Sequence, residues 1–328
     1  MSWLDSIGVR GPDRTYRRIG NGQSNLTYLV TGHDGRRVVL RRPPLGAVAG
    51  PAHDVAREAR IMTALQDTAI PVPEVIGVLE ATGPDSATVV ALSHLEGSTP
   101  DTTGIAELTD NACHRVGLEI VGALAELHAL HPADVGLNDL GSSRPLAQRQ
   151  LRRWTSVWER TRTRDLPALT ELGRRIAAAA PEQTTTRLVH GDVHPANVLV
   201  DRTTGRMTAL LDWELCTTGD PLADLGTLLA YWTDPGEEPF MPAPLAQRFA
   251  TPRRTELVEA YVESTGRDVA ALGFWHTLAL WRIAIIAEGV VGRVRDDPRN
   301  RSETWTPSPA TVNLVLERAC AQADRSGL

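Results

Sequence analysis

The segment from Leu188 to Val200 limits most strongly what this chain can fold into. Apolar residues at both of its ends enclose a polar centre that contains Asp192 and Asn197. Short apolar runs on both sides of a polar stretch predict two buried strands joined by a tight functional loop. A further apolar run follows and ends at Asp212. We therefore expect one hairpin to bring two carboxylates and one amide close together.

The bulk composition predicts an ordinary globular chain. Its 328 residues suit one large domain or two lobes, and 42% of them are hydrophobic. The net charge of −6 argues against general nucleic-acid binding, and no run of about 18 apolar residues could span a membrane. The first residues do not resemble a secretory signal, and three widely spaced cysteines fit neither a disulfide framework nor a zinc site. We expect a cytoplasmic protein with reduced thiols.

The basic residues are unusual, because all 34 are arginine. Residues 1–100 contain ten arginines and ten acidic residues, whereas residues 101–328 contain 24 arginines and 30 acidic residues. The whole negative excess therefore lies in the second part of the chain. The lack of lysine also excludes a Walker A loop.

Residues 15–42 have the pattern of a twisted β-hairpin with a glycine-containing tip at Gly20–Asn25. Backbone amides of such a tip can lie over phosphate groups, although most such tips are only turns. The tip is not a dinucleotide-binding fingerprint, because Asn25 occupies the third glycine position and no helix follows.

The next segment completes a β-rich lobe. Apolar residues recur at helical spacing over residues 53–66, with Glu58 beside this apolar stripe. Taken alone, Glu58 would be interpreted as a solvated side chain. Two strands are expected to follow, at residues 72–80 and 88–94. We therefore expect two lobes, residues 1–96 and 97–328.

The second lobe is predicted to be mostly helical. Helices are expected at residues 112–130, 144–161, 173–180, 220–232, 254–265, 269–294 and 309–323. Asp220 is expected to be the N-cap of the fourth, with Pro221 in its first turn. Trp154 and Trp158 lie one turn apart, which indicates packing or, alternatively, the wall of a pocket.

Phosphoryl transfer to a hydroxyl requires few protein groups, and this chain contains each of them in a suitable order. Asp192 can orient the hydroxyl and accept its proton, while Asn197 and Asp212 can hold Mg²⁺. Arg41 can contact the phosphates, with Glu58 holding Arg41 in place. The specific part is the Asp-x4-Asn spacing, which an acid at a strand end follows 15 residues later.

The same residues lie in motifs that resemble those of the aminoglycoside phosphotransferase–like family of small-molecule kinases. The clearest are His190-Gly191-Asp192-Val193-His194-Pro195-Ala196-Asn197, Leu211-Asp212-Trp213-Glu214 and Gly219-Asp220-Pro221-Leu222-Ala223-Asp224-Leu225. The resemblance covers most of residues 15–295. It is strongest to a subgroup that includes stand-alone bacterial phosphotransferases and the kinase domain fused to some acyl-CoA dehydrogenases.

This resemblance implies an α+β, two-lobed protein-kinase-like fold that uses Mg²⁺ and ATP, with GTP as the alternative donor. It implies that Asp192 is the catalytic base, that Asn197 and Asp212 bind Mg²⁺, and that Asp224 braces the catalytic loop. The residues implied to contact the nucleotide are Gly22, Gln23, Ser24, Asn25, Arg41, Ser93, His94 and Leu95.

Two alternatives remain. The first is a nucleotide-binding module without catalysis, because most kinases have lysine where this chain has Arg41, although arginine at this position also resembles the habit of the subgroup. Arginine is planar and permanently charged, and it can still bridge phosphate and Glu58 with altered geometry. The second is a binuclear metallophosphoesterase, because His190, Asp192 and His194 could ligate a metal. The sequence lacks the upstream Asp-x-His and the Asn-His pair that such enzymes need.

The acceptor is expected to be a small hydroxylated molecule bound in the second lobe. The residues expected around it are His194, Trp154, Trp158, Glu214 and Arg282. The acidic excess would suit a cationic aminoglycoside, whereas the subgroup resemblance and the arginines near Trp154 favour a hydroxyacyl compound or another anionic metabolite. His190 is expected to support the loop. The sequence does not indicate an oligomeric state.

Overall fold

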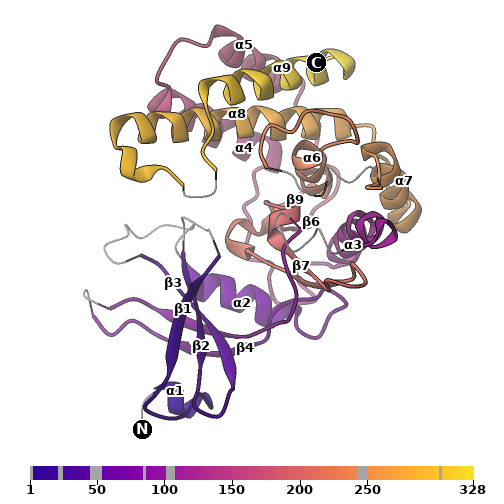
Figure 1. The fold of residues 1–328 in the computed structure, drawn as a ribbon. Coiled ribbons are helices and arrows are strands. Elements are labelled where there is room, and N and C mark those ends of the chain that lie inside the picture. Colours follow the sequence, from indigo (N-terminus) through magenta and orange to yellow (C-terminus); the bar gives the residue numbers. More distant parts are fainter. Residues whose placement is uncertain are drawn as a thin grey trace.

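The computed structural model describes residues 3–20, 25–44, 54–83, 86–100, 108–242, 245, 250–302 and 305–328. A five-stranded sheet and one long helix form the N-terminal lobe, and helices dominate the C-terminal lobe (Figure 1). The expected α+β, two-lobed kinase-like fold is therefore confirmed. The boundary expected at residue 96 stays a prediction, although the chain does pass between the lobes in this region.

The sheet is antiparallel throughout, with strand order β1-β2-β3-β5-β4. Its strands are β1 (Thr15–Ile19), β2 (Leu26–Thr31), β3 (Arg37–Arg42), β4 (Val75–Leu79) and β5 (Val89–Ser93). Side chains alternate between the two faces, so Val38 joins a small core under the N-terminal helix α1 (Trp3–Ser6) while Val39 packs against the main core. This alternation explains why both faces of β3 are covered.

Helix α2 (Val55–Leu65) packs against β4 and β5. It begins at Asp54, whose carboxylate accepts a hydrogen bond from Arg57 N at 2.9 Å. The neighbouring residues in the sequence suggested that Glu58 is a solvated side chain. This is wrong, because Glu58 is only 3% exposed. Burial of a carboxylate requires a partner, and Glu58 faces Arg41.

The seven expected helices are present with shifted ends. They are α3 (Asp110–Ala129), α4 (Leu146–Thr161), α5 (Pro167–Ala178), α6 (Leu222–Tyr231), α7 (Arg254–Thr265), α8 (Leu272–Asp296) and α9 (Pro309–Arg325). Helix α8 is apolar around most of its circumference because α4, α5, α6 and α9 surround it (Figure 1). Among the described residues, no helix is both long and apolar enough to cross a membrane.

Two details of the C-terminal lobe differ from expectation. The N-cap of α6 is Pro221 and not Asp220, although Asp220 Oδ1 still accepts a hydrogen bond from Leu222 N at 2.9 Å. The single hairpin expected from Leu188 onward is also wrong. Strand β6 (Arg187–Val189) pairs with β9 (Thr217–Gly219), and β7 (Val198–Val200) pairs with β8 (Met207–Leu210).

The 3-10 turn η3 (Pro195–Asn197) accounts for the altered pairing. It redirects the chain between β6 and β7, so these strands join different ladders. Leu211 N then donates to Asn197 O at 2.7 Å, which ties the end of β8 to the loop after β6. Asp192 and Asp212 are thus brought together by two small sheets and not by one hairpin.

Candidate active site

A buried carboxylate holds the backbone of the loop after β6. Asp224 is fully buried, and its two oxygens accept hydrogen bonds from His190 N at 2.7 Å and Gly191 N at 2.8 Å. His128 Nε2 lies 3.2 Å from Asp224 Oδ2, and its Nδ1 lies 2.8 Å from Tyr261 Oη. This chain of contacts connects the loop to α3, α6 and α7. The structure therefore places Asp224 where it can fix the loop conformation.

The two histidines of this loop are oriented by peptide N–H groups. Asp192 N donates to His190 Nδ1 at 3.3 Å, and Ala196 N donates to His194 Nδ1 at 3.2 Å. In the neutral ring the proton is then on Nε2 in both cases. His190 Nε2 donates to Leu211 O at 2.9 Å, whereas His194 Nε2 points to Asp192 Oδ2 at 3.5 Å. The His190 ring is neutral because its Nδ1 accepts a backbone N–H, and burial lowers the pKa of His190 in the same sense.

Asp192 lies among donors that favour its ionised form. Arg282 Nη2 is 3.3 Å from its Oδ1, and Asn197 Nδ2 is 3.4 Å from its Oδ2. Burial alone would raise the pKa of this carboxyl group, but the hydrogen bond from His194 and the charge of Arg282 hold the pKa well below its usual range. Arg282 Nη1 also donates to Gly191 O at 2.9 Å, which fixes the guanidinium beneath the loop.

Arg41 makes two ion pairs, one within the N-terminal lobe and one to the C-terminal lobe. Its Nε lies 2.8 Å from Glu58 Oε2, and its Nη2 contacts Asp212 Oδ1. Burial, the largest influence, raises the pKa of Glu58 to about 7, and Arg41 opposes this rise. The structure thus brings together three residues that the sequence assigned to phosphate and metal binding.

Asp212 has a strained backbone. Its φ of 66° makes it the one non-glycine residue with positive φ in the described part of the chain. Such a conformation costs free energy and occurs frequently at ligand-binding positions. Here it lies two residues after the end of β8, and the Asp212 carboxylate contacts Arg41.

The oxygen atoms near Asp212 fit a magnesium ion. Asn197 Nδ2 donates to Asp192 O at 2.9 Å, which leaves the amide oxygen as an acceptor. Glu214 Oε2 is buried without a hydrogen-bond partner among the described residues. Burial first, and the charge of Asp212 second, raise the pKa of Glu214 to about 7. Hard oxygen donors of this kind suit Mg²⁺, which retains water and phosphate oxygens as its other ligands.

A transition-metal centre would need a different donor set. In the ranges that the structure describes, no group of three or more His, Cys, Asp or Glu side chains has an arrangement that could hold a metal ion. His190 is turned to Leu211 O, so His190, Asp192 and His194 do not converge on one point.

A cavity of about 380 Å³ lies between the lobes next to Arg41. Its volume is in the range of small-molecule sites. The expected site residues in its wall are Asn25, Arg41, Glu58, Ser93, His94, Leu95, Asn197 and Asp212. Gly22, Gln23 and Ser24 lie outside the described residues. The cavity therefore joins the strand end at residues 93–95 to the proposed metal ligands.

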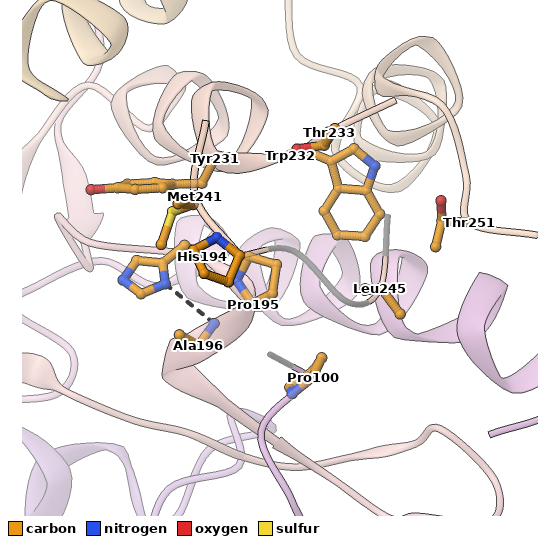
Figure 2. A pocket seen from close by; sticks show the side chains of 11 residues that line it. Pro100, His194, Pro195, Ala196, Tyr231, Trp232, Thr233, Met241, Leu245 and Thr251 are labelled. Atoms are coloured by element: carbon orange, nitrogen blue, oxygen red, sulfur yellow. Dashed lines mark hydrogen bonds between the residues drawn. The ribbon is translucent and has the colours of Figure 1, made fainter. Parts of the chain in front are cut away.

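A smaller pocket of about 40 Å³ lies beside the loop after β6, and we call it the His194 pocket (Figure 2). Its wall is formed by Pro100, His194, Pro195, Ala196, Tyr231, Trp232, Thr233, Met241, Pro242, Leu245 and Thr251. The rings of His194 and Tyr231 lie 4.7 Å apart. None of the described residues in this wall has an acidic side chain.

The remaining expected acceptor residues have different surroundings. Trp154 and Arg282 line one further pocket together with Gly191. Trp158 is 4% exposed and its Nε1 donates to Thr170 Oγ1 at 3.1 Å, which favours packing over a place in an acceptor pocket. Glu214 lies near Asp212, Arg41 and Glu58, on the side of the cleft.

Sequence reasoning missed several supporting residues. Arg57 Nη1 donates to Glu214 O at 3.1 Å, and Arg57 Nη2 contacts Cys216 O, so α2 is fastened to the segment after Asp212. His128 and Tyr261 were missed as well. Each of these contacts joins residues more than 90 positions apart, and no local pattern marks them.

Comparison with known proteins agrees with this geometry. A model of the phosphotransferase enzyme family matches residues 15–258. Mouse acyl-CoA dehydrogenase family member 10 is 28% identical over 278 residues, which cover 83% of this chain and 26% of the mouse protein. The chain thus spans about a quarter of the length of this relative.

Solved structures show the same fold. A protein of Ralstonia eutropha, provisionally assigned as an aminoglycoside phosphotransferase, is 26% identical with a TM-score of 0.72, over 99% of this chain and 94% of that chain. A thermostable variant of aminoglycoside phosphotransferase APH(4)-Ia, in ternary complex with AMP-PNP and hygromycin B, is 16% identical with a TM-score of 0.62, over 95% and 94% of the two chains. The extent of the family match, together with the cleft around Arg41 and Asp212, shows that this chain belongs to the phosphotransferase enzyme family.

Proposed function

We propose that this protein is an ATP- and Mg²⁺-dependent kinase that transfers the γ-phosphoryl group to a hydroxyl of a small molecule. The observation that carries the proposal is that Asn197, in the wall of the cavity lined by Arg41, Glu58 and Asp212, is hydrogen-bonded to Asp192, so Asp192 lies next to this cavity. Phosphoryl transfer needs this combination of a carboxylate, a fixed cation and metal ligands. The AMP-PNP and hygromycin B in the structure of APH(4)-Ia support a nucleotide donor and a small acceptor by likeness of fold.

Each residue has a defined part in the proposed reaction. Arg41, fixed by Glu58, binds the phosphates, and Asn197 and Asp212 would hold Mg²⁺. The ion would neutralise charge that develops on the phosphoryl oxygens. Asp192 is ionised because of His194 and Arg282, so it orients the acceptor hydroxyl and accepts its proton as the oxygen bonds to phosphorus. The bond from the γ-phosphorus to the bridging oxygen breaks, and the nucleoside diphosphate leaves.

The test is a substitution at Asp192. Asp192→Asn should lower kcat by about 1,000-fold or more, because the acceptor hydroxyl loses its base. The dissociation constant for the nucleotide should change less than about threefold, since Asp192 does not line the nucleotide cavity. The measurement is product formation over a panel of hydroxylated acceptors, with nucleotide affinity determined by calorimetry. Full activity in the variant would disprove the assigned role.

A nucleotide-binding module without catalysis is the second candidate. The observation that favours it is the ion pair between Arg41 and Asp212, because it occupies a proposed metal ligand. This candidate predicts calorimetric binding of ATP that does not depend on Mg²⁺, with no turnover of any acceptor. Mg²⁺-dependent binding would exclude it.

The cellular setting remains part of the proposal. A reducing cytoplasmic location is supported by the cysteine spacing, because three widely spaced cysteines do not fit a disulfide framework. No partner other than the small-molecule acceptor is proposed.

A further inference from the structure

Five arginines line an open groove of about 430 Å³ along α4, and we call it the arginine groove. Its wall consists of Arg144, Arg149, Arg152, Arg153, Ser156 and Arg160. No acidic residue belongs to this wall, although the chain as a whole has a net charge of −6. Five like charges along a few helical turns repel one another, so this arrangement is unfavourable without a counter-charge.

Within the described ranges, the hydrogen bonds and ring contacts of three of these guanidinium groups are with neutral partners. Arg149 Nη1 donates to Thr217 Oγ1 at 3.1 Å, and its Nη2 donates to Thr218 O. Arg160 donates to Ser156 Oγ, and the guanidinium of Arg153 lies 5.2 Å from the centre of the Trp154 ring. Arg149 Nε is buried without a partner. The groove therefore has positive charge and unused donors.

The arginine groove leads to the catalytic loop. Trp154, on which Arg153 lies, lines the adjoining pocket together with Gly191 and Arg282. Arg282 in turn contacts Gly191 O and Asp192. The pKa of Arg153 is lowered, first by partial loss of water around the guanidinium and second by repulsion from the positive charge of Arg282, while the charge of Glu214 opposes this fall. An anion in the groove would relieve this repulsion.

We propose that the arginine groove binds a phosphate group carried by the acceptor, and so directs the acceptor hydroxyl toward Asp192. This inference rests on the proposed kinase function and adds the chemical class of the acceptor, a phosphorylated alcohol. Arginine suits this part because its planar fork of donors matches the geometry of a phosphate.

The experiment compares glycerol 3-phosphate with glycerol, which has the same hydroxyl chemistry without the phosphate. Calorimetry is carried out on the full chain with Mg²⁺ and saturating AMP-PNP, so that the nucleotide cavity is filled. Glycerol 3-phosphate should bind at least about tenfold more tightly than glycerol. The double variant Arg152→Gln/Arg153→Gln should lose at least about tenfold of this affinity, because charge-assisted hydrogen bonds disappear.

A matched control removes the same charge elsewhere. Arg202 and Arg206 are exposed in the turn between β7 and β8, outside the groove. Arg202→Gln/Arg206→Gln should bind glycerol 3-phosphate as the unaltered chain does. Arg152 and Arg153 are also exposed, so both double variants should fold, which thermal unfolding verifies.

The outcomes separate this inference from the proposed function. Equal binding of glycerol and glycerol 3-phosphate, or equal losses in the two double variants, would overturn the phosphate site. Asp192→Asn should still bind glycerol 3-phosphate, since the groove does not include Asp192. A chain that binds this probe through Arg152 and Arg153 but phosphorylates no acceptor would disprove the kinase function alone.

Discussion

The cleft around Arg41 and the arginine groove on α4 differ in how their positive charges are balanced. In the cleft, the guanidinium of Arg41 lies between Glu58 and Asp212. In the groove, the hydrogen-bond and ring partners of Arg149, Arg153 and Arg160 are neutral, and no acidic residue belongs to the described part of the wall. The charges of the cleft thus suit a ligand that contains both a cation and an anion, such as a magnesium nucleotide. The groove is prepared for an anion alone.

Arg282 lies between these two regions. It contacts Asp192 on one side, and its charge acts on Arg153 on the other. A residue that bears on both the catalytic carboxylate and the groove can couple acceptor binding to the orientation of Asp192. The difference between the regions therefore suggests which substitutions should affect nucleotide binding, acceptor binding, or both.

The largest effect on activity is expected in the cleft, where two acidic residues balance the charge of Arg41. Arg41→Ala leaves Glu58 and Asp212 without their shared cation, so kcat/KM for the nucleotide should fall by about 100- to 1,000-fold. Arg41→Lys should retain activity within about tenfold, because it keeps the charge but loses the two-pronged contact. Steady-state kinetics at varied nucleotide concentration measures both. If Arg41→Ala keeps its nucleotide kcat/KM, the cleft does not depend on this cation.

A smaller effect is expected at the residue between the regions. Arg282→Gln should lower kcat by about 30-fold, because Asp192 loses one of the groups that orient it. Removing this positive charge also raises the pKa of Asp192, so the acidic limb of the kcat–pH profile should move to higher pH. Arg282→Lys is the matched variant and should move that limb less. An unchanged pH profile in Arg282→Gln would separate Arg282 from Asp192.

The smallest effect concerns stability and tests the burial of Glu58. Its pKa is raised from 4.5 to about 7, so between these values the folded chain holds a proton that the unfolded chain has lost. Rising pH through this window therefore destabilises the fold. Urea unfolding from pH 5 to 8 should show the unaltered chain losing roughly 2 kcal/mol relative to Glu58→Gln.

The control for this measurement is a glutamate in solvent. Glu263→Gln alters an exposed side chain on α7 and should run parallel to the unaltered chain across the same pH range. If the unfolding free energies of Glu58→Gln and of the unaltered chain also change in parallel with pH, Glu58 is ionised throughout this range. Arg41 would then compensate fully for its burial.

Much of the fold followed from local patterns. The periodicity of apolar residues located every long helix, although the helix expected at 173–180 begins at Pro167 and ends at Ala178. The pairing of strands was less accessible, because Leu188-Val189 and Val198-Leu199-Val200 look like partners in sequence and belong to different ladders. A three-residue run carries no information about its partner, since hydrogen bonding in a ladder uses only the backbone.

The candidate site divides in the same way. Asp192, Asn197 and Asp212 were identified from their spacing, and the structure places them around one loop. The ion pair between Arg41 and Asp212 joins residues 171 positions apart, and no sequence pattern near either residue predicts it. The buried path from Tyr261 through His128 to Asp224 was also beyond prediction, because isolated polar residues on helices usually face solvent.

The sequence by itself determined the family, the two-lobed class of fold and the chemical identity of the groups around Asp192, because these depend on residue types at short spacings. Only the tertiary structure decided which arginines are balanced. The sequence contains 34 arginines that look alike, yet the fold places Arg41 between two acids, whereas the arginines of α4 form no salt bridge among the described residues. The electrostatic free energy of a charged group depends on its distance from other charges and on its burial, and the sequence alone gives neither quantity.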